Sequence, residues 1–470
     1  MKWIIAALVL FLAQIVTIVV AERKRPHKMM AWLTIQFIAP FAGFLAFLFL
    51  AFRYKHFRHP RRTASERLER ARHELAERCR TDIPFDRSAE DVGPLAEREA
   101  FPFAPVTWRN RTDVFAEAGP AFESMLDAME AATDHIHIEF YIFRDDRIGG
   151  RFLNAMIRKA EAGVQVRLLY DGMGSLSLGG AFVKRLRDAG VETGCFLPPL
   201  FAFFDRRLNY RNHRKILVVD GKIGFFGGLN IGDEYLGNDP KLGFWRDTHI
   251  RVEGDAVPWL QHAFLTDWYF VKGEALDGER YFPLHGWTGR ERVRIVKSGP
   301  DMASHPVYEL FFACIMSAKR RIWIETPYFV PDSGLMAALK TAALRGLDVR
   351  VIIPSVSDSP VAQWATLSCA EELIPFGVRF YRYRKGFLHA KVMIVDQLAC
   401  SGTANMDMRS FFDQFEIHAL FFEPDTVKRF ENDFARDLNE SEEIGLSEFR
   451  ERPFAIKVRQ RLARMLSPLL

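Results

Sequence analysis

A chain of 470 residues, 49% hydrophobic and 26% charged, has room for about two or three domains and the composition of an ordinary folded protein. Its formal net charge of +5 and pI of about 8.9 favour anionic partners only weakly. The five cysteines are scattered and form no CxxC pair, which argues against a disulfide framework and a zinc site and fits a reducing compartment.

Two apolar runs lie near the amino terminus, at residues 3–20 and 29–52. They hold 18 and 24 residues without a charge, and a bilayer requires about 20, so residues 1–52 are predicted to form a hairpin of two transmembrane helices. A cleaved signal peptide is the alternative for the first run, although the second run directly after it favours a retained hairpin.

The distribution of basic residues predicts how this hairpin is oriented. The connecting loop carries four Lys or Arg, whereas residues 53–72 carry eight and Lys2 adds one. Basic residues concentrate on the cytoplasmic side of membrane proteins. The chain is therefore predicted to be a multi-pass protein of the cell (inner or plasma) membrane, with its main body and both chain ends in the cytoplasm.

The body of the chain contains an internal repeat. Two pairs of similar stretches mark it: 134–143 with 320–329, and 162–172 with 345–355. Helix signals such as GGRFLNAMIRKAEAG and SGLMAALKTAALRG follow the strand-like stretches, and the offset is too long for a solenoid. The alternation predicts an α/β fold with two fused copies of one domain, at residues 101–290 and 291–440.

Charged segments flank this repeat. Residues 53–100 are basic and charged, and their helix-forming part is predicted to be a solvated link between membrane and body. Residues 441–470 form an amphipathic tail, in which Ile456, Val458 and Leu462 share one face. Such a helix lies in a membrane interface or docks on its own domain, and the sequence leaves both alternatives open.

Each copy of the repeat carries the pattern H-x-K-x4-D at the head of an apolar run. The six residues are His213, Lys215, Asp220, His389, Lys391 and Asp396. On a strand the His and Lys of each pattern share a face, whereas the Asp has the opposite parity and is expected to brace the strand end. A Gly-rich return follows each strand, GGLN or GTAN, and places Asn230 and Asn405 beside the histidines.

Two histidines with two lysines and two asparagines suit the chemistry of a phosphate diester. The cations and amides would neutralise and orient the phosphate oxygens. One imidazole would attack phosphorus, and the other would protonate the leaving alcohol and then deprotonate the acceptor. This chemistry requires no metal or other cofactor. Core histidines with lysines at strand ends are the structural alternative, but a match in both copies of a repeat argues against it.

These residues resemble the phospholipase D superfamily, whose signature is the duplicated His-Lys-Asp motif. Within it the chain is similar to the bacterial cardiolipin synthases, through GGLNIGDEYLG, WRDTHI at 245–250, ETPYFVPD at 325–332 and NMDMRS at 405–410. The resemblance covers residues 101–440. It implies two phospholipase D-like α/β sandwich domains, related by a pseudo-twofold axis, with one active site between them.

The resemblance also implies a carboxylate partner for each histidine. Glu416, which follows His389 along the chain, is expected to orient that residue, and Asp247 is expected to orient His213. Family precedent makes His213 the nucleophile and His389 the acid and base.

Two further features bear on the site. Asn405 follows Asp396 one residue sooner than Asn230 follows Asp220, which a tighter hairpin turn would explain; a displaced Asn405 would instead impair the second half-site. Aromatic and basic residues alternate at 197–211 and 379–389. They are interpreted as the mouth of the site, meeting acyl chains and anionic headgroups, with strand packing as the alternative.

The function implied by the resemblance is the transfer of a phosphatidyl group between two phosphatidylglycerol molecules, through a phosphohistidine, with release of glycerol. The expected partners are phospholipids and the membrane, not nucleic acid. A membrane-bound phospholipase D that forms phosphatidic acid is the first alternative. A nuclease of the same superfamily and a binding module without catalysis are weaker ones.

Overall fold

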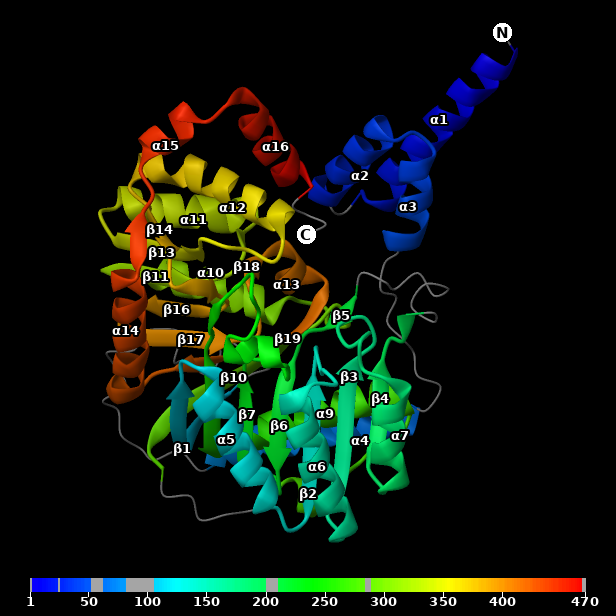
Figure 1. Ribbon diagram of the computed structural model, residues 1–470, viewed down its shortest axis with the longest axis vertical. Helices are drawn as coiled ribbons and strands as arrows, with labels where there is room; N and C mark the ends of the chain where they lie inside the picture. The colour runs from blue at the N-terminus through cyan, green and yellow to red at the C-terminus, as the bar shows by residue number, and fades with distance from the viewer. Residues whose placement is uncertain are drawn as a thin grey trace.

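The computed structural model describes residues 2–23, 26–51, 62–81, 105–199, 210–283 and 289–466. One long sheet runs through its centre, and each half of the chain contributes strands in the same spatial order (Figure 1). In the first half this order is β4 (Glu192–Phe196), β3 (Gln165–Asp171), β2 (His135–Phe140), β6 (Lys215–Val219), β7 (Ile223–Gly227), β9 (His249–Gly254) and β1 (Val106–Phe115). In the second it is β14 (Arg379–Tyr383), β13 (Asp348–Pro354), β11 (Arg321–Glu325), β16 (Val392–Val395), β17 (Leu398–Gly402), β19 (Gln414–Phe421) and β10 (Glu291–Ser298), with β20 (Ser441–Glu443) at the edge. Strands β1 and β10 pair antiparallel and join the halves.

Helices cover the faces of this sheet (Figure 1). The first half contributes α5 (Ala118–Glu130), α6 (Arg147–Glu161), α7 (Gly180–Asp188) and α9 (Val257–Lys272). The second contributes α10 (Pro306–Ser317), α11 (Ser333–Leu344), α12 (Pro360–Leu373), α13 (Met408–Phe412), α14 (Pro424–Asn439), α15 (Leu446–Glu451) and α16 (Phe454–Met465). Strand β2 is buried along its whole length because helices cover both of its faces. The predicted α/β fold with an internal repeat is confirmed, and α6 and α11 occupy the two predicted helical stretches.

Short strands connect the two halves near the motifs. Strand β5 (Arg211–Asn212), just before the first motif, pairs with β19 of the second half. Strand β15 (Gly386–Leu388), just before the second motif, pairs with β8 (Phe244–Arg246) of the first half. Each motif therefore begins against backbone that belongs to the other copy.

The hairpin after the second motif is shortened only in its turn. Val219 pairs with Ile223 in the first hairpin, and Val395 pairs with Leu398 in the second, so one turn residue is missing. Beyond the turn, the separation along the chain from Ile223 to Asn230 equals that from Leu398 to Asn405. The shorter return therefore leaves the place of Asn405 in the repeat unchanged.

The amino-terminal region consists of α1 (Lys2–Ala21), α2 (Pro26–Ile38) and α3 (Ala42–Leu50). Within the described residues, only α1 is long and apolar enough to cross a membrane. It projects from the body with the amino terminus at its tip (Figure 1). The second predicted span is divided between α2 and α3 near Pro40, which has no backbone N–H to donate, and Phe41 there has a φ of 65°. The prediction of two membrane-spanning helices is thus confirmed only for the first helix, by its length and composition.

The linker helix α4 (Arg62–Thr81) is not a solvated connection, contrary to the prediction. Its Leu68 and Leu75 are buried in the core that surrounds α9. The backbone carbonyl of Leu68 also lies 3.1 Å from Nε2 of His262 on α9. The sequence pattern missed this contact because the helix is highly charged and buries only two large apolar side chains. The rest of the predicted linker, apart from α4, lies outside the described residues.

The tail helix α16 docks on its own domain, which is one of the two predicted alternatives. Its Ala463 is buried against Ala365 of α12, and Gln460 is buried as well. The apolar face noted in the sequence points elsewhere: the exposed residues are Phe454, Ile456, Val458, Leu462 and Met465. The helix therefore packs through small and polar side chains and leaves its apolar row uncovered.

Candidate active site

A cavity of about 680 Å³ lies between the two halves, and both motif histidines line it. Its other lining residues come from both copies of the repeat: Tyr141, Ile142, Arg144, Asn230, Glu234, Tyr235, Asp239, Leu242, Trp245, Tyr328, Val330, Asp358, Ser359, Ala362, Asn405, Asp407, Arg409 and Gln414. The two histidines are far apart in the sequence, and the near-twofold arrangement of the sheet brings them to one place.

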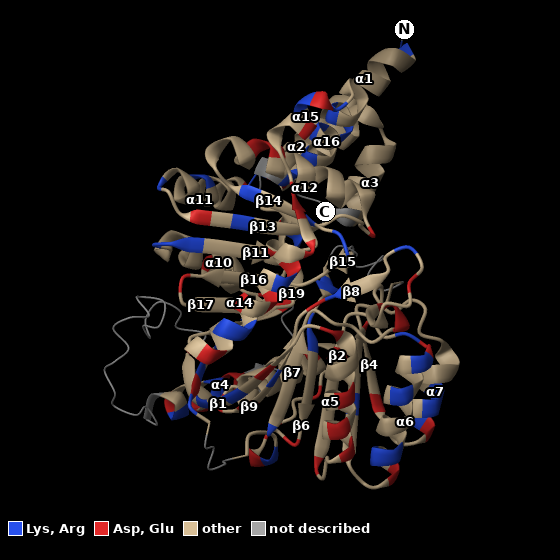
Figure 2. Ribbon diagram, turned by 60° about the vertical axis from the view of Figure 1, so that its left-hand side comes forward, with Lys and Arg blue, Asp and Glu red and all other residues tan. Residues whose placement is uncertain are grey.

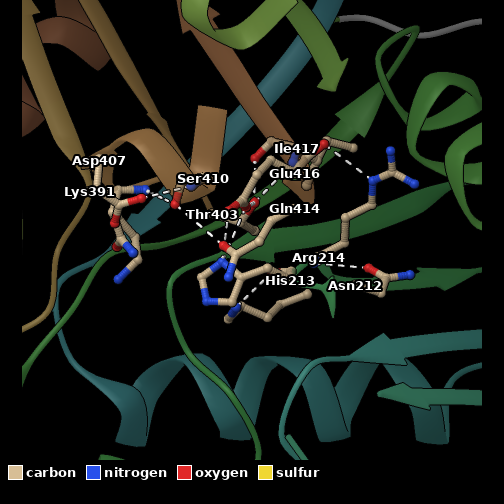
Figure 3. Close-up of polar contacts among 12 residues, drawn as sticks. Asn212, His213, Arg214, Lys391, Thr403, Asp407, Ser410, Gln414, Glu416 and Ile417 are labelled. Atoms are coloured by element: carbon tan, nitrogen blue, oxygen red, sulfur yellow. Dashed lines mark hydrogen bonds and ion pairs between the residues drawn. The ribbon is translucent and has the colours of Figure 1, made fainter. Parts of the chain in front are cut away.

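His213 is held by strand β19 of the other half. Its backbone N–H donates to the carbonyl of Phe415 over 3.0 Å. Its Nδ1 lies 3.0 Å from Oε1 and 3.2 Å from Oε2 of the next residue, Glu416 (Figure 3). The hydroxyl of Thr403 donates to the same carboxylate. With Nδ1 bonded to Glu416, Nε2 is the ring nitrogen left for chemistry.

His389 has an equivalent environment built from the first half. Its backbone N–H donates to the carbonyl of Arg246 over 2.7 Å. Its Nδ1 lies 2.6 Å from Oδ2 of Asp247, whose Oδ1 accepts the backbone N–H of Thr248 over 2.8 Å. Both histidines therefore form a carboxylate–imidazole pair whose members come from different halves.

The predicted assignment of carboxylates to histidines is wrong. Asp247 orients His389 rather than His213, and Glu416 orients His213 rather than His389. The cause is the pairing of β5 with β19 and of β15 with β8, which places each histidine beside the opposite repeat. Order along the chain carries no signal for this exchange.

The two lysines lie beneath the histidines rather than on the cavity wall. Lys215 and Lys391 are both buried, and each ammonium donates to the carbonyl of the histidine two residues before it, over 2.7 Å in the first motif. Burial lowers the pKa of Lys215 to about 7 and that of Lys391 to about 8. Neither is among the residues that line the cavity.

The pKa values of the two carboxylates are shifted in opposite directions. Burial raises the pKa of Glu416 to about 7, against the opposing effect of Lys215. Burial also opposes ionisation of Asp247, but Lys391, His389 and the Thr248 N–H outweigh it and lower its pKa. The pKa of Asp247 is thus lowered, whereas that of Glu416 is raised.

Both imidazoles are held in the neutral form when no ligand is bound. Burial is the first cause in each case and lowers the pKa of both rings. Lys215 and Lys391 lower the pKa of His213 further, to well below its ordinary value. Asp247 opposes the effect of burial on His389, so this second imidazole has a neighbour that favours its protonated form.

The two motif aspartates brace strand ends, as their parity predicts. Asp220 accepts the backbone N–H groups of Thr133, Asp134 and His135 over 2.8 to 2.9 Å. Asp396 accepts those of Lys319, Arg320 and Arg321 over 2.7 to 3.0 Å. Both aspartates have a left-handed backbone, with φ of 53° and 50°. Neither lines the cavity, so their role is to hold the motif strand against β2 or β11.

The two asparagines line the cavity but are used differently. Asn230 accepts the N–H of Ile142 over 3.0 Å and donates to the Tyr235 hydroxyl over 2.5 Å, so both ends of its amide have protein partners. The backbone N–H of Asn405 donates to Ser410 Oγ over 3.2 Å. Its buried side-chain Oδ1 has no hydrogen-bond partner in the described part of the chain. Asn405 therefore lines the cavity with a buried acceptor that is unpaired among the described residues.

The glycine of the first return loop is required by close packing. A Cβ on Gly228 would lie 1.8 Å from Oδ1 of Asp247. In the second loop, a Cβ on Gly402 would lie 2.3 Å from the carbonyl of Ile417, the residue after Glu416. The glycines thus allow the carboxylate-bearing strands to approach the motif hairpins, as the sequence pattern predicts.

Several residues of the cavity wall were not identified from the motif pattern. Arg144 and Arg409 bring guanidinium groups, and Tyr141, Tyr235 and Tyr328 bring aromatic hydroxyls. Arg409 and Tyr328 belong to NMDMRS and ETPYFVPD, two stretches that support the family resemblance, so that signal was present without a role attached. Among the described residues, no three His, Cys, Asp or Glu side chains are grouped so as to hold a metal ion.

The prediction that the arginines of residues 379–389 lie at the mouth of the site is wrong. Arg379, Arg382 and Arg384 form ion pairs with three glutamates after α14: Glu443, Glu448 and Glu442. The alternation there reflects packing between β14 and the following segment, which was the structural alternative. Most of the stretch at 197–211 lies outside the described residues.

Comparison with known proteins identifies relatives of the whole chain. A family model described as "Cardiolipin synthase, PLD-like domain" matches twice, at residues 125–250 and 311–438. The chain is 40% identical to a cardiolipin synthase of Geobacillus thermodenitrificans, over 99% of this chain and 93% of the relative. It is 37% identical to the major cardiolipin synthase ClsA of Bacillus subtilis, over 97% and 96% of the two chains.

A solved structure shares the fold. The phosphatidylserine synthase of Haemophilus influenzae aligns with a TM-score of 0.61 and 13% identity, over 86% of this chain and all of the other. At that identity the likeness establishes the arrangement of the two domains and no more.

Proposed function

The chain belongs to the cardiolipin synthase family and carries its phospholipase D-like domain twice; on this premise we propose that it transfers a phosphatidyl group from one phosphatidylglycerol to another. The products would be cardiolipin and glycerol. The observation that carries the proposal is the pair of carboxylate-bonded imidazoles that line one cavity. A two-step transfer needs one nucleophile and one acid–base group at the same phosphorus, and this pair supplies both.

In the first step, Nε2 of His213 attacks the phosphorus of the donor lipid. The anionic phosphate of the donor favours uptake of a proton from water by His389. The bond from phosphorus to the glycerol headgroup breaks, and the His389 imidazolium gives that oxygen its proton, so glycerol leaves. The phosphatidyl group then remains on His213 as a phosphohistidine. Arg144 and Arg409, whose side chains line the cavity, would bind the phosphate oxygens as their charge develops.

In the second step, the headgroup of another phosphatidylglycerol supplies the nucleophile. His389, now neutral, removes the proton of a primary hydroxyl, and the alkoxide oxygen bonds to phosphorus as the bond to His213 breaks. Each proton given in the first step is recovered in the second, so the enzyme returns to its starting state.

The difference between the two carboxylates supports this division of roles. His213 has a pKa well below its ordinary value, which keeps its ring unprotonated and nucleophilic. His389 lies against Asp247, the carboxylate whose pKa is lowered, and an ionised partner stabilises the imidazolium that an acid must form.

The location follows from the amino-terminal helices and the charge distribution. One apolar helix of spanning length supports attachment to the membrane, and the basic residues around it favour a body on the cytoplasmic side of the plasma membrane. No second helix among the described residues is long and apolar enough to cross a membrane.

Product analysis tests the proposal. Purified full-length protein in mixed micelles of detergent and phosphatidylglycerol should form cardiolipin and glycerol in equal amounts. Phosphatidic acid as the main product would instead identify a hydrolase. His213→Ala and His389→Ala should each abolish turnover, and Arg379→Ala, on the surface away from the cavity, is the matched control.

A further inference from the structure

The amino-terminal helices make a buried contact with the catalytic body. Lys28, near the start of α2, forms an ion pair with Asp413, and the side chains are 9% and 1% exposed. Asp413 directly precedes β19, the strand that holds Glu416. The start of α2 therefore lies against the body, close to the catalytic strand.

This contact is incompatible with two complete membrane passes. Two passes would put the loop between the apolar runs, which precedes Lys28, on the opposite side of the bilayer from the body. A lysine there could not pair with a buried aspartate of the body. The contact requires that loop and body occupy the same side.

The lengths of the helices lead to the same arrangement. At 1.5 Å per residue, the 20 residues of α1 extend about 30 Å, which matches the hydrocarbon core of a bilayer. The 13 residues of α2 and the 9 of α3 extend only about 20 Å and about 14 Å. Neither of them spans the core alone.

The packing of α2 and α3 shows that the chain turns back. Trp32 of α2 and Phe47 of α3 meet edge to face, with ring centroids 5.6 Å apart. Next along the described chain, α4 is docked on the first domain through Leu68 and Leu75. The chain thus leaves the body at α2, turns near Pro40 and comes back to it.

The free end of this hairpin is apolar. Phe37, Ile38 and Leu45, near the turn, are 64%, 68% and 57% exposed. Figure 2 shows α1, α2 and α3 almost without charge along their lengths. Large apolar side chains at an exposed tip are suited to hydrocarbon rather than water.

From these observations we infer that the chain crosses the bilayer once, through α1, and that α2 and α3 form a re-entrant hairpin in the leaflet next to the catalytic body. A buried hydrogen bond of 2.6 Å between Gln14 and Gln36 holds α1 against α2. The amino terminus then lies on the side opposite to the body. The inference rests on the proposed membrane attachment, and its test does not depend on catalysis.

The distribution of charge agrees with a single pass. Arg23 and Lys28 lie on the side of the body together with the basic residues of α4, and Lys2 lies on the other side. The helix α16, which carries an uncovered apolar row, contacts α2, as expected of a helix near the surface of the same leaflet.

Labelling of single cysteines distinguishes the two topologies. The five native cysteines are first replaced, and one cysteine is added in an extension before Met1, at Arg23 or at Lys184, an exposed position of the body. Intact spheroplasts are treated with a membrane-impermeant maleimide. The extension should react at once, and Arg23→Cys and Lys184→Cys only after the membrane is disrupted. Reaction of Arg23→Cys in intact cells with a protected extension would establish two passes. Protection of all three positions would show that α1 does not cross, and either result overturns the inference.

A cross-link tests the contact itself. In membranes, a short bismaleimide should join Lys28→Cys to Asp413→Cys. It should not join Lys28→Cys to Asp425→Cys, on the exposed first turn of α14. Failure of the first pair, with both cysteines shown to be reactive, would remove the observation on which the topology depends.

Discussion

Replacing Asp247 by asparagine should separate the two steps of the reaction. The asparagine Oδ1 can still accept the Thr248 N–H, now 2.8 Å away, so the local backbone is expected to persist. Its amide NH₂ would replace the carboxylate oxygen that lies 2.6 Å from Nδ1 of His389. Nδ1 must then accept a hydrogen bond, and the proton moves to Nε2. In that tautomer His389 is a poor acid and has no lone pair with which to act as a base.

The size of the effect follows from the loss of acid and base function together. A wrong histidine tautomer in a carboxylate-imidazole site lowers turnover about 10,000-fold, so turnover of phosphatidylglycerol should fall about 1,000- to 10,000-fold, or ~4–5.5 kcal/mol in the barrier. A donor with p-nitrophenol in place of glycerol needs no proton on its leaving group. Its first step should therefore slow by less than about tenfold.

Rapid-quench measurement of p-nitrophenol release provides the assay. The Asp247→Asn enzyme should release one equivalent in a burst and then stall as the phosphohistidine, which is stable in base and hydrolysed in acid. Glu416→Gln, in contrast, should lose the burst in addition to turnover, because Glu416 contacts the nucleophile. The opposite pattern, a burst with Glu416→Gln and none with Asp247→Asn, would reverse the roles of the histidines. Turnover of phosphatidylglycerol within about tenfold of wild type in Asp247→Asn would refute the reasoning altogether.

Three other variants test two parts of the site and the stability of the fold. Gly228→Ala should lose most activity because its Cβ would lie 1.8 Å from a carboxylate oxygen, whereas Gly180→Ala, with nothing within 4 Å, should keep it; equal rates in a lipid assay would contradict the packing argument. Arg409→Met should lower activity about 10- to 100-fold through loss of a charge-assisted contact to phosphate, and Arg379→Met, away from the cavity, should not, as steady-state kinetics on micelles would show. Burial lowers the pKa of His418 to about 3, so as the pH falls below 6.5 the unfolded chain binds a proton that the folded chain refuses, and stability is lost. Relative to His418→Leu, the free energy of unfolding of the wild type should therefore fall by up to about 2 kcal/mol between pH 7 and pH 5. Thermal unfolding curves that shift equally with pH in the two proteins would contradict this.

The sequence predicted much of the fold because the repeat carries its signals twice. Each stretch with strand periodicity and each amphipathic helix had a counterpart in the other copy, and β2, β11, α6 and α11 lie at the expected places. The parity of the motif residues also separated the two aspartates from the histidines. These features depend on local geometry, which a sequence pattern records directly.

The features that the sequence missed depend on contacts between distant segments. The exchange of carboxylates arises from pairings such as that of β5 with β19, which involve only two residues on the first strand. The docking of α4 buries two leucines, Leu68 and Leu75, within a helix that is otherwise highly charged. The division of the second apolar run at Pro40 was also not predicted, because proline is tolerated within membrane helices. The predicted domain boundaries remain predictions.

The short strands that pass between the repeats have a consequence for how such a chain changes over time. Neither copy contains a complete carboxylate–imidazole pair. A damaging substitution in one copy therefore also impairs the histidine of the other, and the duplication gives no redundancy. Selection must act on both copies together. A single copy separated from this chain would be active only if it associated with a second copy that supplies the missing carboxylate.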